Sequence, residues 1–461
     1  MEQRKTTFFQ ALITVAVLGV IMFLSIVKFD ASPHIPMLLG CGIAGCVALW
    51  AGYKWEDVEE GMISGIHQAL ESLIILMLIG VLVSTWIQAG TVPAMICYGL
   101  QLLSPRFYLV TTMVICSVIS MAVGSWGTAG TVGLAFIGIA SALGIPLPLA
   151  AGAIVSGSYV GDKLSPLSDS TNLASAVTGV NVFDNVRHMF PIAGGAYLLA
   201  AVIYAVIGFQ YGAGGAEAMA NVGEYVRLLR ESFWISPLAL LPLMLLVVCI
   251  CVKIPAIPSI GIGILAAAVQ AMITQGAGMG DILTMGYSGY VSHTGNEMLD
   301  TLLTAGGMEA MLFSVSMIMV AMMFGGIMEK TGQMEALMAP VMKLVHSVRV
   351  LVTATVMSCI AVNLILPEQY IAIAIPGRMY ANEYDKRQVD RKDLAVALGA
   401  GGAATSALVP WNTCGIYMTG VLGVSTFAYM PFAFFNLMMP LAMILATGFI
   451  QNKREQTSNK Y

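Results

Sequence analysis

The stretch 157–174, GSYVGDKLSPLSDSTNLA, carries the side chains of this chain that are best suited to chemistry. It lies between long apolar runs, yet it holds two carboxylates, Asp162 and Asp169, with Lys163 beside the first and Pro166 between them. Ionisable groups at membrane depth are costly and by default indicate an ion or substrate pathway. If this stretch lies in a membrane, it is therefore the first candidate for a functional site.

A helix break is expected at Pro166, because proline lacks a backbone donor and clashes with the preceding turn. Freed backbone carbonyls and side-chain oxygens would then surround a small site, and hard cations prefer oxygen ligands. The predicted Na⁺ ligands are Ser168, Asp169, Thr171 and Asn172, and the wider ion- and proton-binding set adds Asp162 and Ser165. A proton competes with Na⁺ for the same carboxylate. If the binding site can move across the membrane only with Na⁺ or a proton bound, this competition results in cation/proton exchange.

Each carboxylate of this stretch also has a purely structural interpretation. Asp162 could pair with Lys163 at a membrane edge, and Asp169 could cap a helix that begins near Ser170. The capping role is compatible with ion binding, because a cap carboxylate at a helix break is also a good ligand. The residues alone leave these alternatives open.

The composition is that of an integral membrane protein. Of the 461 residues, 58% are hydrophobic and 10% are charged, whereas about a quarter are charged in soluble domains. The net charge of −4 and the lack of a long basic run argue against a nucleic-acid partner. The eight cysteines form no CxxC pair, so we expect reduced thiols and no metal cluster. The apolar run 8–27 is interpreted as a retained helix and not as a cleaved signal.

About 20 apolar residues make one crossing, and ten segments meet this length. These clear spans are near 8–28, 35–53, 71–89, 107–123, 187–209, 233–252, 257–275, 310–328, 349–366 and 428–450. Four further segments are apolar but interrupted by Gly, Pro and polar residues: 126–144, 147–180, 367–380 and 394–424. Irregular backbone at membrane depth must be covered by protein or a water-filled cavity. These four are therefore candidates for broken helices or re-entrant hairpins.

Basic residues orient the chain. They lie before the first span, in the loop 382–393 and after the last span: Arg4, Lys5, Lys386, Arg387, Arg391, Lys392, Lys453 and Arg454. The positive-inside rule then places both termini and this loop in the cytoplasm.

The two halves of the chain resemble each other in register. Residues 109–111 recur at 351–353, an offset of 242, and Pro166 and Gly179 recur as Pro410 and Gly423, an offset of 244. Coincidence in an apolar sequence is the alternative, but the near-constant offset favours a repeat. Transporters commonly contain two repeats of opposite orientation, with the binding site at their interface.

The repeat predicts the organisation of the chain. Residues 1–54 form N-terminal helices, and 55–210 form the first repeat, with a break at 147–180. Residues 211–275 are a linker with connecting helices, 276–450 form the second repeat, with a break at 394–424, and 451–461 are a cytoplasmic tail.

The repeat also predicts a second half-site. Residues 162–172 correspond to 406–416, which contain Trp411, Asn412 and Thr413 but no carboxylate. The neighbouring LPEQY segment supplies Glu368 instead. For Glu368 the structural alternative is a loop carboxylate at the membrane surface. For Asn412 and Thr413 it is a helix cap after Pro410.

Glu71, at the start of the span 71–89, is interpreted as a solvated helix end.

Four segments resemble the NhaC-type Na⁺/H⁺ antiporter family: GDKLSPLSDSTNLA (161–174), VTGVNVFDNVRHM (177–189), YVSHTGNEMLDTLLTAGGMEAM (290–311) and ALVPWNTCG (407–415). The resemblance covers essentially the whole chain in order. It implies an all-α inner-membrane antiporter with two inverted repeats, a scaffold domain and a transport domain with two hairpins. It also implies a site made of Asp162, Ser165, Ser168, Asp169, Thr171 and Asn172, with Trp411, Asn412 and Thr413 opposite. A homodimer is expected by analogy with such folds alone.

Three other functions were compared with Na⁺/H⁺ exchange. The same family includes exchangers that resemble malate/lactate carriers, so a coupled organic-anion or amino-acid exchanger is the main alternative. No Arg lies in a predicted hairpin to bind an organic carboxylate in a bidentate manner, which favours inorganic cations. An aspartyl protease would need its two Asp on facing helices, and a channel does not need two broken repeats. We therefore expect a transporter and not an enzyme, with no cofactor beyond the transported Na⁺ and H⁺.

Overall fold

The computed structural model describes residues 6–29, 31–211, 215–252, 254–342 and 345–458. Their regular structure is helical, and the single β feature among them is an isolated bridge between Tyr290 and Ala305. Five described helices are long and apolar enough to cross a membrane alone, and two bent helix pairs raise that number to seven. The expectation of an all-α, multi-pass membrane protein is confirmed.

The helices of the first half begin after α1 (Phe8–Phe23) and α2 (His34–Trp50). They are α3 (Trp55–Gln88), α4 (Thr91–Leu102), α5 (Tyr108–Thr128), the π-helix η2 (Ala129–Gly133), α6 (Leu134–Ala142), α7 (Leu147–Lys163), α8 (Asp169–Thr178) and α9 (Val182–Tyr211). The linker predicted to begin at residue 211 contains a helix, α10 (Gly215–Ser232), which packs against α4 and α6. Next come α11 (Leu241–Cys251), α12 (Ala256–Thr274), α13 (Met279–Ser288) and α14 (Glu297–Leu303).

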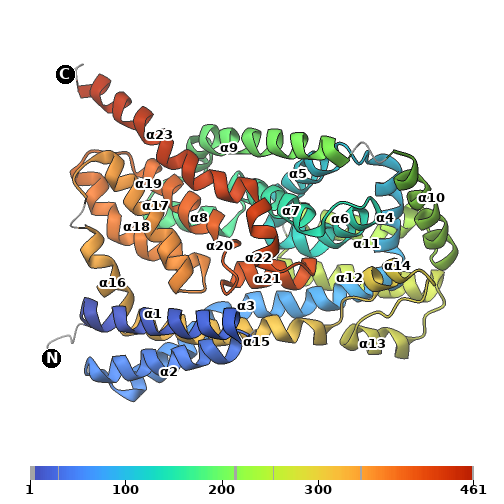
Figure 1. Cartoon of the computed structure of the whole chain (residues 1–461), viewed down its shortest axis with the longest axis horizontal. Coiled ribbons are helices and arrows are strands. Elements are labelled where there is room, and N and C mark those ends of the chain that lie inside the picture. Colours follow the sequence, from blue (N-terminus) through green and yellow to red (C-terminus); the bar gives the residue numbers. More distant parts are fainter. Residues whose placement is uncertain (1–5, 30, 212–214, 253, 343–344, 459–461) are drawn as a thin grey trace.

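The second half of the chain follows α14. It consists of α15 (Met308–Lys330), α16 (Gln333–Met342), α17 (Val348–Ile365), α18 (Gln369–Lys386), α19 (Arg391–Leu398), the π-helix η4 (Gly399–Ala403), α20 (Ala404–Ser406), α21 (Thr413–Leu422), α22 (Thr426–Tyr429) and α23 (Phe434–Ser458). The beginning of α1 and the end of α23 lie at the same end of the molecule (Figure 1).

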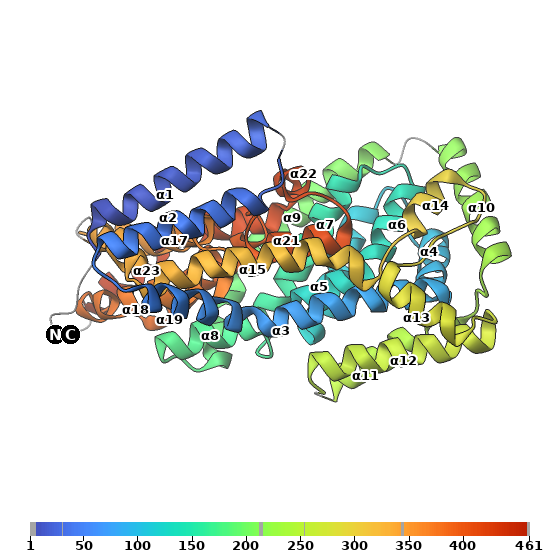
Figure 2. The same cartoon turned by 90° about the horizontal axis from the view of Figure 1, so that it is seen from below.

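Helices α3 and α15 form an antiparallel pair along the long axis of the molecule (Figures 1 and 2). Their backbones touch at glycines: a Cβ on Gly65 would lie 2.0 Å from the Met322 carbonyl oxygen, and one on Gly80 would lie 2.3 Å from that of Gly307. Small residues allow such close approach between membrane helices. Because α3 begins at Trp55, the span expected at 71–89 is too short, and Glu71 lies in the middle of a helix.

Two segments fold back on themselves as hairpins. The first turns at Gly124, whose φ of 74° interrupts the helix, and the Tyr108 hydroxyl then donates to the Phe136 carbonyl at 2.5 Å. The second turns between α17 and α18, where the Ser358 and Tyr380 hydroxyls lie 2.8 Å apart. The tips of these hairpins, Gly124 and residues 366–368, are the irregular backbone predicted near 126–144 and 367–380.

Two further segments are broken helices that continue in the same general direction. After α7 ends at Lys163, α8 packs mainly against α18 and α19 and does not fold back on α7. After α20 ends at Ser406, α21 packs against α15 and η2. The break predicted at Pro166 is confirmed, because Pro166 lies between the two helices. The predicted cap is wrong by one residue, since Ser168 is the N-cap and Asp169 is the first residue of α8.

Candidate ion-binding site

A buried ion pair occupies the break between α7 and α8. The Lys163 ammonium lies 3.2 Å from Asp162 Oδ2, and the Ser170 hydroxyl donates to the same oxygen at 3.3 Å. Lys163 is fully buried and Asp162 is 8% exposed, so the pair expected at a membrane edge is present but lies inside the protein. Removing one partner of such a pair leaves an uncompensated buried charge. The negative charge of Asp162 is therefore balanced within the chain.

Asp169 is in a different position, because its carboxylate has no internal partner. None of the described residues donates a hydrogen bond to this carboxylate or forms an ion pair with it, and its side chain is exposed. The N-terminus of a helix stabilises negative charge, and Asp169 is the first residue of α8. At this break the charge of Asp162 is compensated by Lys163, whereas the charge of Asp169 is uncompensated among the described residues.

A cavity of about 410 Å³ lies at this break. Asp162, Ser165, Ser168 and Asp169 line it, together with Gly124 of the first hairpin tip and Glu71 of α3. The described lining residues include no Lys, Arg or His. Four residues of the predicted site therefore face one cavity, and this cavity carries negative charge.

Thr171 and Asn172, also predicted as ligands, do not line the cavity. The Asn172 amide donates to the carbonyls of Pro166 and Ser168, both at 2.9 Å. The Thr171 hydroxyl donates to the Lys163 carbonyl at 3.4 Å. These two side chains hold the backbone of the break in shape.

The first hairpin tip packs directly on this break. The Ser165 hydroxyl donates to the Met121 carbonyl at 2.7 Å. A Cβ on Gly124 would lie 3.5 Å from Asp162 Oδ1, and the positive φ of Gly124 is a conformation that other residues rarely adopt. Gly124 therefore lets the tip turn beside the carboxylate.

The predicted second half-site is assembled around the break before α21. Asn412 is the N-cap of α21, which confirms the capping alternative, and its amide also donates to Asn363 Oδ1 at 3.1 Å. The Thr413 hydroxyl donates to Glu368 Oε2 at 2.9 Å. Glu368 is 5% exposed, so it is not a surface carboxylate. Trp411 anchors the same break through a 2.8 Å hydrogen bond from its indole to the Leu364 carbonyl.

Aromatic residues connect the two half-sites. Trp126 of the first hairpin tip stacks on Tyr417 of α21 with ring centroids 4.1 Å apart, and the Tyr417 hydroxyl donates to the Trp126 carbonyl at 2.7 Å. Tyr370, beside Glu368, lies within electrostatic range of both Asp162 and Asp169. Sequence reasoning missed these aromatic residues, because rings in apolar segments look like ordinary packing.

The far end of α8 is fixed by Arg391. Its guanidinium donates to the Thr178 carbonyl at 3.1 Å and binds both oxygens of Asp385, at 2.9 and 2.6 Å. These hydrogen bonds hold the pKa of the Asp385 carboxyl below its usual range. The broken helix α7–α8 is thus tied to the turn between α18 and α19.

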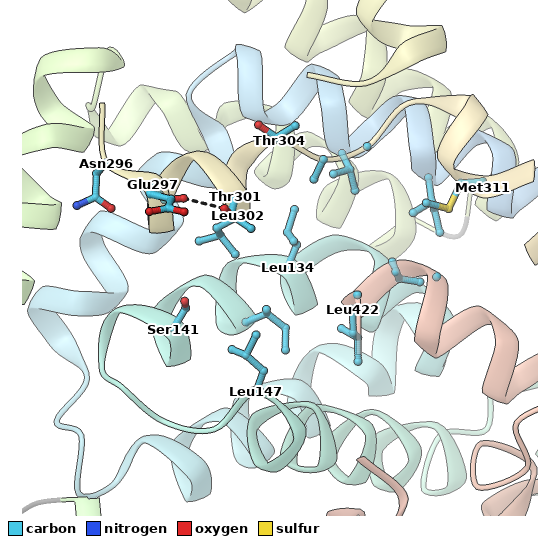
Figure 3. Close-up of a pocket in the computed structure, with 18 of the residues that line it drawn as sticks. Leu134, Ser141, Leu147, Asn296, Glu297, Thr301, Leu302, Thr304, Met311 and Leu422 are labelled. Carbon is cyan, nitrogen blue, oxygen red and sulfur yellow. Dashed lines mark hydrogen bonds between the residues drawn. The ribbon is translucent and has the colours of Figure 1, made fainter. Parts of the chain in front are cut away.

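A second cavity lies elsewhere and is more apolar. Its volume is about 730 Å³, and its walls are mostly apolar, with Leu134, Leu147 and Leu422 among them (Figure 3). Polar residues of the segment 290–311, such as Asn296 and Glu297, line one side. None of the predicted site residues faces it. The predicted site residues and this apolar cavity are therefore in separate places.

Polar helix breaks at the centre of a helical bundle define this chain as a multi-pass membrane protein with an internal charged site. A model of the Na⁺/H⁺ antiporter family matches residues 157–449. The chain is 37% identical to a malate-2H⁺/Na⁺-lactate antiporter of Bacillus subtilis, over 94% of this chain and 92% of the relative. It is 36% identical to the Na⁺/H⁺ antiporter NhaC of the same organism, over 98% and 99%. It is 33% identical to NhaC of Alkalihalophilus pseudofirmus, over 100% of both chains.

The chain belongs to the Na⁺/H⁺ antiporter family. This confirms the family resemblance noted in the four sequence segments.

Proposed function

We propose that this protein is a secondary transporter that exchanges Na⁺ for H⁺ across the cell (inner) membrane by alternating access. One observation carries the proposal: the uncompensated Asp169 carboxylate lies at a helix break and faces a cavity without positive charge. The near full-length similarity to antiporters named NhaC supports the same function.

In the proposed mechanism, Asp169 holds either Na⁺ or a proton. Na⁺ entering from the cytoplasm binds at the break and displaces the proton from Asp169. In this proposal Asp169 and Ser168, which face the cavity, bind Na⁺ directly, while Thr171 and Asn172 hold the backbone of the break in shape. The broken-helix region then moves against the α3–α15 pair, and external protons expel the ion. The Asp162–Lys163 ion pair has no net charge and stays intact during this cycle.

We infer that the halves 55–210 and 276–450 are inverted repeats. At an offset of 244, the caps of α8, Ser168 and Gly179, correspond to the caps of α21, Asn412 and Gly423. At an offset of 242, the last residue of α3 corresponds to the last residue of α15. At the same offset, Gly65 corresponds to Gly307 and Gly80 corresponds to Met322. The contact between Gly65 and Met322 is therefore equivalent to the contact between Gly80 and Gly307. Because α3 and α15 run antiparallel, equivalence between them supports opposite orientation of the two repeats.

We also propose that both termini face the cytoplasm. The positive-inside rule predicts this orientation, and it agrees with the position of α1 and α23 at one end of the molecule (Figure 1). The proposal involves no cofactor and no nucleic acid. A homodimer is part of it by analogy with related folds only.

A coupled organic-anion exchanger is the second candidate, because one relative is named a malate-2H⁺/Na⁺-lactate antiporter. An organic carboxylate would need a cationic or amide partner, and the described walls of the site cavity contain no Lys or Arg. Lys163 is already bound to Asp162 and Ser170. These contacts favour an inorganic cation as the substrate.

The test uses purified protein in sealed proteoliposomes with a trapped pH dye. Na⁺ alone is added first, then malate, lactate and a panel of amino acids. Proton movement with Na⁺ alone, absent with K⁺, is the expected result. Silence with Na⁺ but movement after an organic solute would establish the second candidate instead.

A further inference from the structure

Glu71 is a carboxylate in the middle of the longest helix, and the site described so far gives it no role. It lies sixteen residues after Trp55, the first residue of α3, and seventeen before Gln88, the last. At a rise of 1.5 Å per residue, Glu71 is about 24 Å from the start of the helix. A charge at this depth in a membrane helix is costly unless it has a partner or a function.

The surroundings of Glu71 provide no structural partner. None of the described residues forms an ion pair or hydrogen bond with its carboxylate, and the side chain is exposed. By contrast, Glu60, three turns earlier on the same helix, pairs with Lys330 at 2.8 Å. The carboxylate of Glu71 is therefore uncompensated, as is that of Asp169.

Glu71 faces the same 410 Å³ cavity as Asp169 and Asp162, across from the break. It is close enough to Asp169 for the two charges to act on each other. The described residues that line this cavity also include Ser120 and Thr131. Two like charges that share a cavity repel each other, and a cation between them relieves that repulsion.

We propose that Glu71 is a second cation-binding carboxylate of the transport site, which receives Na⁺ in the cavity and passes it to Asp169. This inference rests on the proposed Na⁺/H⁺ exchange. It adds a residue from outside the signature stretch, contributed by a helix that the glycine contacts with α15 hold firmly. The two carboxylates belong to different parts of the molecule. A movement of α8 relative to α3 changes their separation and with it the affinity for the cation.

The experiment measures the Na⁺ concentration that gives half-maximal exchange in proteoliposomes. Glu71→Gln removes one attractive charge several ångströms from the ion, so this concentration should rise about tenfold while the maximal rate changes little. Glu71→Asp keeps the charge and should restore most of the affinity. Glu60→Gln is the matched control, since it makes the same chemical change on the same helix outside the cavity. Its half-maximal concentration should equal that of the native protein.

The failure of this inference is distinguishable from failure of the proposed function. A native protein that moves no protons with Na⁺ contradicts the proposed exchange itself. Native exchange with an unchanged half-maximal concentration in Glu71→Gln overturns the role of Glu71. An equal loss of affinity in Glu71→Gln and Glu71→Asp, with lowered melting temperatures in both, also overturns it, because that pattern indicates a structural role.

Discussion

The break between α7 and α8 holds two carboxylates and a buried lysine, whereas the break before α21 contains no charged side chain. The backbone design is nevertheless the same. Each break is followed by a ten-residue helix with a polar N-cap and a left-handed glycine at its C-terminus. At the second break, Glu368 arrives from the hairpin tip and is hydrogen-bonded to Thr413. Only the first break therefore has a carboxylate free to exchange its partner.

This comparison teaches that backbone shape and charge are separate parts of the site. Both breaks interrupt a helix and end at a capped helix N-terminus. Under the proposed function, the charged side chains then restrict cation exchange to one break. The other break, held by Asn412, Thr413 and Trp411, supplies a neutral, well-connected wall.

The largest expected effect comes from removing the free carboxylate. Asp169→Asn should abolish Na⁺-driven proton movement and keep the melting temperature, because this side chain has no hydrogen-bond or ion-pair partner in the described part of the chain. Glu368→Gln should keep measurable exchange, since an amide oxygen can still accept the hydrogen bond of Thr413. Exchange assays on both variants check this difference. Asp184→Asn, which alters an exposed pair with Lys392, is the matched control. Abolition by Glu368→Gln alone would reverse the roles of the two breaks.

The next effect concerns stability. Lys163→Met leaves Asp162 buried without a counter-charge and should lower the free energy of unfolding by about 3–5 kcal/mol. Adding Asp162→Asn to the same chain should recover most of this loss. Unfolding in mixed micelles measures both variants. If Lys163→Met alone were as stable as the native protein, the ion pair would not be the element that distinguishes the first break.

The scaffolding around the two breaks should respond equally to matched changes. A Cβ on Gly157 would lie 2.3 Å from the Met113 carbonyl oxygen, and one on Gly401 would lie 2.6 Å from that of Val356. Gly157→Ala and Gly401→Ala should therefore each cost about 1–3 kcal/mol. Gly194→Ala is the control, because its Cβ would have no neighbour within 4 Å. Costs that differ widely between the first two variants would argue against equivalent packing in the two halves.

The smallest effect is on the helix caps. Ser168→Ala and Asn412→Ala each remove an N-cap, which costs about 1 kcal/mol. Asn412→Ala should cost somewhat more, because Asn363 also loses a hydrogen bond. The melting temperatures of the two variants provide the comparison. A larger loss for Ser168→Ala would show that the first break depends more strongly on its cap.

Much of the local structure could be predicted from the sequence. The span expected at 349–366 is α17, Val348–Ile365, and the helix break at Pro166 lies where it was predicted. The repeat predicts Glu368 next to the segment 394–424, and its carboxylate accepts a hydrogen bond from Thr413 there. Apolar runs and proline act through the local backbone, so these features are visible in the order of residues.

The position of Glu71 could not be predicted in the same way. Residues 55–70 include Glu59, Glu60 and His67, so hydropathy alone starts the span too late. The structure continues α3 through this polar region, because its glycines pack against the backbone of α15. That contact joins residues more than two hundred positions apart.

The sequence by itself determined that this is a helical membrane protein with two broken segments, one charged and one neutral. It determined these features because hydrophobic length, proline and the identity of the carboxylates are local properties. Only the tertiary structure decided which carboxylate is compensated: Asp162 and Asp169 line the same cavity, but among the described residues only Asp162 has partners, Lys163 and Ser170. Burial and electrostatic pairing depend on which distant segments meet, and that is settled when the two halves pack together.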